Sequence, residues 1–496
     1  MPGTLRRLFH FAGLAMAASA SADAAIHVVT PTSNLQSVIN AAASGDEIRF
    51  EPGLYRTGCL DIFKRLTLTA RVPHSAILQG SANAPLSANA GDAAAAACGF
   101  NLARRTADGT RIEGLQFQYF RHAIYGKGLA NLVIVNNRFV SNFGNGVALR
   151  DTADIEIARN AFLDPYLPND TPGTVEPYWV NPVGVTDAQM DYGVSIYGSL
   201  RPRVHHNYFF GVFNQALSFK IANRDAYAGY NTFEGYSLTA LFFGQEPSID
   251  ATYPEFGLSG WDGGRIVAEG NVFRAVRAEH PGTHALVEYR GRSPLRIRYV
   301  NGDVTVRNNI VESGILGFTI ECNGSQCPMG TIDVTNNLIV GRVITGDNVA
   351  HDIGVCGIDV QPQTTAQVRV FQNTIAWHRF GVCAEGGVLR VQNTEFHRNR
   401  ERDVRATPDV IDYNNQYTAA GPVLGAHSTN VDPRFYAAPD LRIRTAAVRL
   451  TPNRSFSRPF YLTPQSPGAT SGSQGLFKGA YPLITTMLFE DNFEVP

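Results

Sequence analysis

Short stretches in which apolar and polar residues alternate run along most of the chain, and this pattern predicts β-strands rather than helices. An asparagine followed two residues later by an apolar residue recurs after these stretches. The copies are NNRF (Asn137), RNAF (Asn160), HNYF (Asn207), YNTF (Asn231), GNVF (Asn271), NNIV (Asn309), NNLI (Asn337) and QNTI (Asn373), with weaker copies at QNTEF (Asn393) and NNQY (Asn415). The shortest spacings are about 20–24 residues, and we interpret the longer ones as the same unit with an inserted loop.

The length of this repeat selects the fold. A unit of about 22 residues has room for three short strands and their turns, which is one coil of a parallel β-helix, whereas a propeller blade needs about 40–45 residues. Asparagines stacked in the same turn of successive coils can hydrogen-bond each other and the backbone. The apolar residue two positions later points the same way and is expected in the core.

The two ends of the repeat region carry further signals. Residues 34–56, NLQSVINAAASGDEIRFEPGLYR, predict a short amphipathic helix followed by a strand, and such a helix would cover the first coil. This stretch resembles the N-terminal cap of secreted right-handed β-helix proteins, and residues 430–443 and 465–482 resemble closing segments of bacterial members. The resemblance implies an all-β, single-domain right-handed parallel β-helix of about 10–12 coils over residues 25–482, followed by a tail at 483–496.

The N-terminus predicts export. Arg6 and Arg7 precede a short apolar run and a small-residue cleavage site, so residues 1–24 are expected to be a signal peptide cleaved after Ala22 or Ala24. No later segment reaches about 18 uninterrupted apolar residues, so we expect no membrane span and a secreted protein, periplasmic or extracellular.

The net charge of the chain limits the classes of binding partner that we expect. The net charge of −1 gives no global basic field, so nucleic acid is not an expected partner and any anion must bind to a local patch. We expect a monomer that binds an acidic polysaccharide. The sequence itself requires no cofactor, and a calcium ion stays open.

The six cysteines are expected to form disulfides, because an exported protein meets an oxidising compartment. Their spacing suggests the pairs Cys59–Cys98, Cys322–Cys327 and Cys356–Cys383, although six cysteines allow 15 connectivities. A zinc site is not expected, because CNGSQC lacks a second nearby pair or histidines at ligand spacing.

A second strand follows each repeated asparagine and suggests a site. In QALSFKIA, alternation directs Leu217 and Phe219 inward and Lys220 outward. The equivalent outward residues in neighbouring coils are Arg150, Tyr197, Gln245, Glu288, Arg290 and Glu321. Because neighbouring coils lie about 4.8 Å apart, these side chains would form a polar column along an extended polymer.

Two insertions, residues 164–191 and 246–263, flank this face and are expected to wall it on both sides. They carry Trp179 and Trp261, which could stack on sugar rings or could pack the loops onto the coil. Arginines cluster in EYRGRSPLRIRY, residues 288–299. This run is either a solvated turn or a patch that favours an anionic polymer.

A lysine in such a column suggests β-elimination on a uronic-acid polysaccharide. A base removes the proton at C5 and an acid assists loss of the 4-linked sugar. Lys220 could be the base if its pKa falls from about 10.4 to about 8, a change of about 3 kcal/mol that desolvation and nearby cations can supply. Arg150, Arg224 and Arg290 could also hold the carboxylate, and Tyr197 could be the acid.

The segment ALSFKIANRDAYAGYNTF resembles the lysine-bearing segment of the β-helix lyases that include chondroitinase B and alginate lyases. The resemblance implies that Lys220 is the base. In that family an arginine on the next coil is the acid, and glutamates hold a calcium ion. Those positions fall near Phe243 and near Phe213 and Gln215, so the acid and the calcium site do not carry over.

Three alternatives stay open. A glycoside hydrolase would need paired acids on one face, for which Glu288 with Glu321 is a weak substitute. A non-catalytic carbohydrate-binding protein or adhesin would need only the fold and its outer face. An epimerase would share the proton-abstraction step with a lyase.

Overall fold

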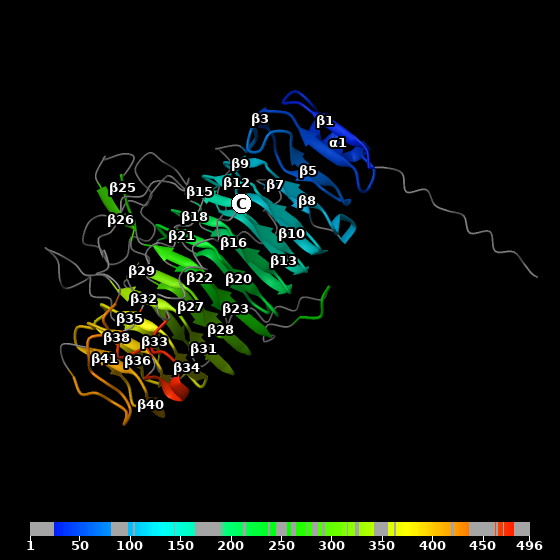
Figure 1. Ribbon diagram of the computed structural model, residues 1–496. Coiled ribbons are helices and arrows are strands. Elements are labelled where there is room, and N and C mark those ends of the chain that lie inside the picture. Colours follow the sequence, from blue (N-terminus) through cyan, green and yellow to red (C-terminus); the bar gives the residue numbers. More distant parts are fainter. Residues whose placement is uncertain are drawn as a thin grey trace, which may run out of the picture.

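The computed structural model describes residues 24–80, 98–102, 105–142, 144–163, 190, 192–211, 215–236, 239–244, 255–258, 264–274, 276–279, 286–289, 293–314, 316–322, 327–341, 356–361, 364–417, 421–435, 462, 465–469 and 471–480. Three long parallel sheets lie side by side along an elongated body (Figure 1). Successive strands join the three sheets in turn, so the chain winds as a right-handed parallel β-helix. The predicted fold is confirmed.

The fourteen-stranded sheet runs in the order β1 (Ile26–Val29), β2 (Glu47–Phe50), β5 (Thr67–Ala70), β8 (Arg111–Glu113), β11 (Val133–Val135), β14 (Glu156–Ala158), β17 (Arg203–His205), β20 (Tyr227–Gly229), β23 (Arg265–Glu269), β28 (Asp303–Arg307), β31 (Thr331–Thr335), β34 (Gln367–Phe371), β37 (Val388–Gln392) and β40 (Val410–Asp412).

The twelve-stranded sheet runs in the order β4 (Leu60–Asp61), β7 (Cys98–Leu102), β10 (His122–Ala130), β13 (Asn145–Ala153), β16 (Tyr192–Leu200), β19 (Gln215–Lys220), β22 (Thr239–Gly244), β27 (Ser293–Arg298), β30 (Phe318–Glu321), β33 (Cys356–Val360), β36 (Phe380–Ala384) and β39 (Arg402–Arg405).

The thirteen-stranded sheet runs in the order β3 (Gly53–Arg56), β6 (Ala76–Gln79), β9 (Gln116–Gln118), β12 (Arg138–Val140), β15 (Ala161–Leu163), β18 (Tyr208–Phe210), β21 (Thr232–Glu234), β24 (Val272–Arg274), β29 (Ile310–Gly314), β32 (Leu338–Gly341), β35 (Thr374–Ala376), β38 (Glu395–His397) and β41 (Asn415–Tyr417). A separate antiparallel pair consists of β25 (Val276–Glu279) and β26 (Leu286–Tyr289).

The predicted capping helix is α1 (Leu35–Ala41), at the N-terminal end of the stack (Figure 1). It begins at Asn34, whose side chain accepts a hydrogen bond from the backbone N–H of Ser37. Leu35 and Ile39 are its buried residues and join the core of the first coils. No helix in the described part of the chain is long and apolar enough to cross a membrane.

The asparagine ladder forms as the repeat predicted. The side-chain Nδ2 of Asn207 donates to Oδ1 of Asn231 at 3.0 Å, and that of Asn231 donates to Oδ1 of Asn271 at 3.0 Å. Each Oδ1 also accepts the backbone N–H of the asparagine one coil earlier, as Asn231 does from Asn207 at 3.0 Å. The same contacts join the eight strong copies from Asn137 to Asn373.

The two weak copies were misplaced by one residue. Asn393 has φ of 51° and takes the left-handed turn position, so Thr394 occupies the ladder position. Its backbone N–H donates to Oδ1 of Asn414 at 2.9 Å, which makes Asn414 the next ladder residue. Asn415 instead begins β41.

The apolar residues two positions after the ladder stack in the core. Phe139, Phe162, Phe209, Phe233 and Phe273 lie one above the other, with ring centroids 4.7–5.1 Å apart and nearly parallel planes. Offset stacking adds to the free energy gained from their burial. The prediction that these residues fill the core is confirmed.

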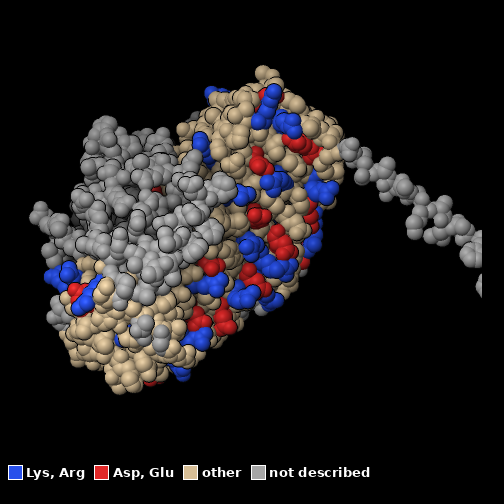
Figure 2. Space-filling view, viewed as in Figure 1, with Lys and Arg blue, Asp and Glu red and all other residues tan. Residues whose placement is uncertain are grey.

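The outer surface of the fourteen-stranded sheet carries charges of both signs. At the corner before β14 and β17 Asp154 pairs with Arg201 at 2.6 Å, and on β23 and β28 of the sheet Glu269 pairs with Arg307 at 3.1 Å. Lys and Arg alternate with Asp and Glu along the flank where β23, β28 and β31 lie (Figure 2). Interleaved charges leave no extended field of one sign on this flank.

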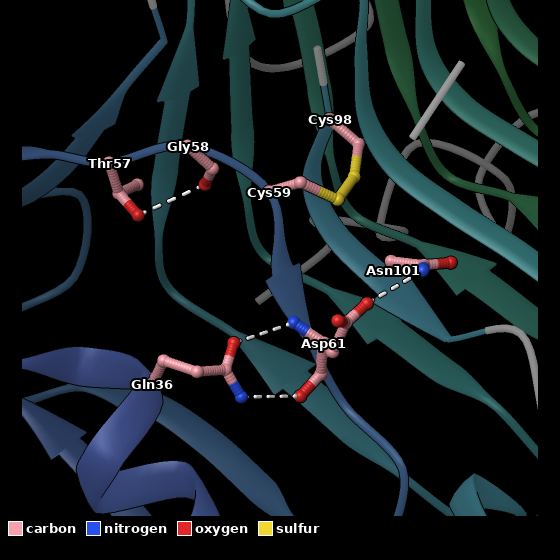
Figure 3. Close-up of a disulfide and its surroundings, with 7 residues drawn as sticks. All are labelled: Gln36, Thr57, Gly58, Cys59, Asp61, Cys98 and Asn101. Atoms are coloured by element: carbon pink, nitrogen blue, oxygen red, sulfur yellow. Dashed lines mark hydrogen bonds between the residues drawn. A yellow bond between two sulfur atoms is a disulfide. The ribbon is translucent and has the colours of Figure 1, made fainter. Parts of the chain in front are cut away.

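All three proposed disulfides are present. Cys59–Cys98 joins the segment before β4 to β7, beside the hydrogen bond from Asn101 Nδ2 to Asp61 Oδ1 at 2.7 Å (Figure 3). Three disulfides fit an oxidising compartment. Cys356 and Cys383 lie near Asp359 as a metal site would require, but the disulfide leaves neither sulfur as a thiolate ligand.

The last coil places a carboxyl group inside. Asp403 of β39 lies beside Gly381 of β36. A Cβ built on Gly381 would lie 2.6 Å from the ring of Phe396, so this position of the strands faces the core. Asp403 is 3% exposed, and Nδ2 of Asn399 donates to its Oδ1 at 2.9 Å. Burial raises the pKa of the Asp403 carboxyl to about 7.

Replacing one ladder asparagine should destabilise the protein strongly. In Asn231→Ala the backbone N–H of Asn207 and the carbonyl of Val204 lose buried partners. We expect the free energy of unfolding in urea to fall by about 2–4 kcal/mol. Asn430→Ala, at an exposed position, is the control and should change it little. Equal effects in the two variants would contradict a structural role for the ladder.

Asp403→Asn should become more stabilising as the pH rises. Above about pH 4 the unfolded state loses this proton, while the folded state keeps it until about pH 7. The native protein therefore loses stability between pH 4 and 7, and the variant lacks this loss. We expect the difference in unfolding free energy between variant and native protein to grow by roughly 4 kcal/mol from pH 4 to 8. A pH-independent difference would refute an interior, protonated Asp403.

Candidate functional site

The outer face of the twelve-stranded sheet carries the residues of the predicted column. In β19, Leu217 and Phe219 join the core, and Lys220 lies on the opposite face of the strand. Tyr197 lies beside Lys220 in β16, and Arg150 lies beside Tyr197 in β13. The sequence therefore placed three outward residues of adjacent coils correctly.

A glycine kink sets which residues face outward at the start of these strands. A Cβ on Gly193 would lie 2.6 Å from the carbonyl oxygen of Ala216 and 2.7 Å from the ring of Phe209, so this position accepts no side chain. Gly193 and Val194 thus point inward in succession, and the strict alternation is interrupted. Tyr192 consequently lies on the same outer face as Tyr197.

Lys220 lies between these two tyrosines. Its Nζ donates to the hydroxyl of Tyr192 at 3.0 Å, and it lies 4.5 Å from the ring centroid of Tyr192 and 5.8 Å from that of Tyr197. Lys220 is 4% exposed. Its amine is thus held by aromatic groups on the outer face, outside the coil core.

The column continues in both directions along the β-helix axis. Before Arg150 it contains Lys127 of β10, and the Arg150 guanidinium lies 5.6 Å from the ring centroid of Tyr197. After Lys220 it contains Gly244, which contributes no side chain, then Arg298 and Glu321. Gly244 is required because a Cβ would lie 2.4 Å from the carbonyl oxygen of Arg298.

Two arginines form salt bridges with one carboxylate in the C-terminal part of this face. Glu321 Oε1 lies 2.5 Å from Arg296 Nη2 and 3.1 Å from Arg298 Nε. Asp359 lies one coil further, beside Thr319. Burial and the nearby carboxylates of Glu385 and Glu321 raise the pKa of Asp359.

The rows behind the column contain buried polar groups. Ser195 and Ser218 lie side by side on the outer face, both 0% exposed, and neither hydroxyl has a hydrogen-bond partner among the residues that the structure describes. Nδ2 of Asn145 bonds to Nδ1 of His122 at 3.0 Å, while Oδ1 of Asn145 has no partner. Burial lowers the pKa of His122 to about 4, so this imidazole is neutral at pH 7.

Part of one insertion borders these coils. Glu255 pairs with Arg105 of the short 3-10 helix η2 (Arg105–Ala107) at 2.9 Å, and its backbone N–H donates to Asp151 Oδ2 at 3.2 Å. Leu258 packs on Ile221 just after Lys220. Residues 255–258 therefore contact the ends of the strands from β10 to β19, one after another.

The other predicted site residues do not join the column in the described part of the chain. Arg224 lies at the corner after β19, where its backbone pairs with Leu200 and its side-chain stem approaches Gly264. Glu288 lies in β26, which pairs with β25 and not with the coils, so its expected place in the stacked strands was wrong. Gln245, Arg290, Trp179 and Trp261 lie outside the described residues.

Sequence reasoning missed Tyr192 and Lys127. Strict alternation from Val194 would point Tyr192 inward, and only the glycine at 193 signals the interruption. Lys127 occurs in HAIYGKGLA, a strand that precedes the first strong repeat asparagine and was not aligned with the others. The arginines at 296 and 298 were noticed as a cluster, but β26 was taken for their coil strand.

Solved structures share this fold. The A-module of mannuronan C-5 epimerase AlgE6 from Azotobacter vinelandii is similar over 78% of this chain and 94% of its own length, with 12% identity and a TM-score of 0.51. The catalytic domain of a GH87 α-1,3-glucanase is similar over 75% of this chain with 11% identity and a TM-score of 0.41, and just under two thirds of that domain, 66%, is spanned. An alginate lyase from Paenibacillus sp. str. FPU-7 is similar over 77% of this chain and 99% of its own length, with 13% identity and a TM-score of 0.42.

No protein-family model and no curated protein sequence matches the chain. The likeness of the Lys220 segment to chondroitinase B therefore stays a prediction. At identities this low, structural similarity concerns the fold alone. The chain is a single-domain right-handed parallel β-helix that shares its fold with the epimerase module.

Proposed function

We propose that this protein is a secreted enzyme that cleaves a uronic-acid-containing polysaccharide by β-elimination, with Lys220 as the base. The observation that carries the proposal is the amine of Lys220 held at 3.0 Å from Tyr192, in register with Tyr197 and Arg150 on one outer face. A base, two hydroxyl donors and a cation on adjacent coils are the groups that the reaction needs.

The reaction assigns each group a step. The neutral amine of Lys220 takes the proton from C5 of the uronate, and the electrons of that C–H bond form the C4=C5 double bond. The bond between C4 and the glycosidic oxygen breaks, and a tyrosine hydroxyl gives its proton to that oxygen. The products are a chain with a new hydroxyl end and a chain with a 4,5-unsaturated end.

The surroundings of Lys220 suit this role. A charged ammonium loses hydration when it is buried, so low exposure favours the neutral amine that a base requires. The missing side chain at Gly244 separates Lys220 from Arg298, and we assign the uronate carboxylate to this part of the column. Arginine can bind it through paired hydrogen bonds.

Lys220→Ala should abolish cleavage. Purified protein is incubated with alginate, pectate, glucuronan and glycosaminoglycans, and unsaturated product is followed by its ultraviolet absorbance. We expect kcat/KM to fall by at least about 100-fold, since a positioned base contributes this much or more. Arg390→Gln, a charge removal at an exposed position in β37, should leave activity unchanged. Undiminished activity in Lys220→Ala would refute the role of this lysine.

The two tyrosines distinguish the proton donor. The sequence singled out Tyr197, whereas Lys220 donates its hydrogen bond to the hydroxyl of Tyr192. If Tyr192 only orients the amine, Tyr192→Phe should lower kcat modestly, while Tyr197→Phe should lower it by about 100-fold as loss of an acid predicts. The reverse order would make Tyr192 the donor. Repeating the assay with a chelator tests whether arginines suffice to neutralise the carboxylate.

A hydrolase is the second candidate, and one observation favours it. Asp359 has a raised pKa and lies near Glu321, and two carboxyl groups in different environments can serve as acid and base. New reducing ends without unsaturated product, lost in Asp359→Asn and kept in Lys220→Ala, would establish hydrolysis. Binding without any new ends would establish a carbohydrate-binding protein.

A further inference from the structure

The outer face of the twelve-stranded sheet is divided by charge along the β-helix axis. On β10, β13 and β19 the outward basic residues are Lys127, Arg150 and Lys220, and the one carboxylate in the described parts of these strands and of β16 is Asp151, which accepts the backbone N–H of Glu255. On β30 and β33 the outward ionisable groups are Glu321 and Asp359. The division falls between Lys220 and Glu321.

The cations on the two sides of this division differ in their pairing. Arg296 and Arg298 both contact Glu321, and Arg405 lies 3.5 Å from Glu385. Lys127 and Arg150, in contrast, have no carboxylate partner among the described residues. Unpaired cations can bind an anionic ligand without first breaking an ion pair, so the N-terminal part of the face is the better site for it.

Buried polar groups lie on the same N-terminal part. Within the described part of the chain, the hydroxyls of Ser195 and Ser218 and Oδ1 of Asn145 have no hydrogen-bond partner, although both serines are 0% exposed. A buried polar group without a partner costs free energy. Sugar hydroxyl groups could supply such partners.

The segment 255–258 borders these coils along one edge. Its contacts run from Arg105 through Asp151 to Ile221, which covers the strand ends from β10 to β19. The carboxylate of Glu255 is paired with Arg105 and therefore does not oppose an anionic ligand. Three independent features, unpaired cations, unpartnered polar groups and a fixed border, thus coincide on the same coils.

We propose that the polymer extends from the reacting uronate beside Gly244 toward the N-terminal side of Lys220, with Arg150 and Lys127 binding the carboxylates of further uronate units, and that Glu321, Asp359 and Glu385 end the binding site beyond β27. This inference rests on the proposed function, because it assumes an anionic polymer. Coils repeat about every 4.8 Å, a spacing comparable with the length of one hexopyranose unit. Lys127, the more distant of the two, then contacts only chains long enough to reach it.

The inference makes binding depend on chain length. In full-length Lys220→Ala protein, which does not cleave, affinity for oligogalacturonates and alginate oligosaccharides of increasing length is measured by calorimetry at low salt. Adding Lys127→Gln should weaken the longest oligomers by about twofold to fivefold and leave the shortest unchanged. Adding Arg150→Gln should weaken oligomers of intermediate length as well. Lys220→Met replaces Lys220→Ala if the latter does not fold.

Two further variants separate a local site from a general charge effect. Asp359→Asn should strengthen the binding of long oligomers, because it removes a charge that ends the site, and Arg390→Gln on the other flank should change nothing. The proposed subsites would be overturned if Lys127→Gln lowered the affinity equally for oligomers of all lengths. They would also be overturned if Arg390→Gln lowered the affinity as much as Lys127→Gln does.

The cleavage assay on the native protein distinguishes failure of this inference from failure of the proposed function. Unsaturated product together with length-independent effects of Lys127→Gln would retain the lyase and refute the subsites. Length-dependent effects without any product would retain the subsites and refute the lyase. No binding of any acidic oligomer and no product would refute both.

Discussion

The hydrogen-bonded register between coils is the constraint on which the rest of the structure depends. Each ladder asparagine accepts the backbone N–H of the asparagine one coil earlier and donates to the next side chain, so every coil is aligned with its neighbour residue by residue. The stacked phenylalanines follow from this alignment, because residues at the same position of each coil must lie directly above one another. The polar column on the outer face follows for the same reason.

The fold could be predicted because its signal is repeated. Eight copies of the asparagine pattern give the period, and the period allows few architectures. The disulfides could be predicted from proximity, since cysteines near each other in sequence reach neighbouring coils. The weak copies at 393 and 415 were placed one residue off, because Thr394 interrupts the ladder and the neighbouring asparagine imitates it.

The site could be predicted where strict alternation holds and not where the backbone departs from it. Arg150, Tyr197 and Lys220 obey the alternation and were found. Tyr192 lies beyond the kink at Gly193, a conformation set by the close approach of Ala216 and Phe209 from other strands. The misassignment of Glu288 has a different cause, since β25 and β26 form a hairpin whose alternating pattern equals that of a coil strand. No local signal separates the two.

The displacement at Asn393 also marks where the unbroken run of ladder asparagines ends, one coil before the last strands β39, β40 and β41. With φ of 51° at this residue, its side chain points away from the ladder, and both its amide and carbonyl groups bind Ser473 of the returning C-terminal segment. A duplicated coil inserted before Asn373 would meet a ladder asparagine on either side, whereas one inserted after Asn393 would meet a threonine and a covered surface. The length of such a protein can therefore change in evolution by gain or loss of middle coils, while the terminal coils that cap the stack are retained.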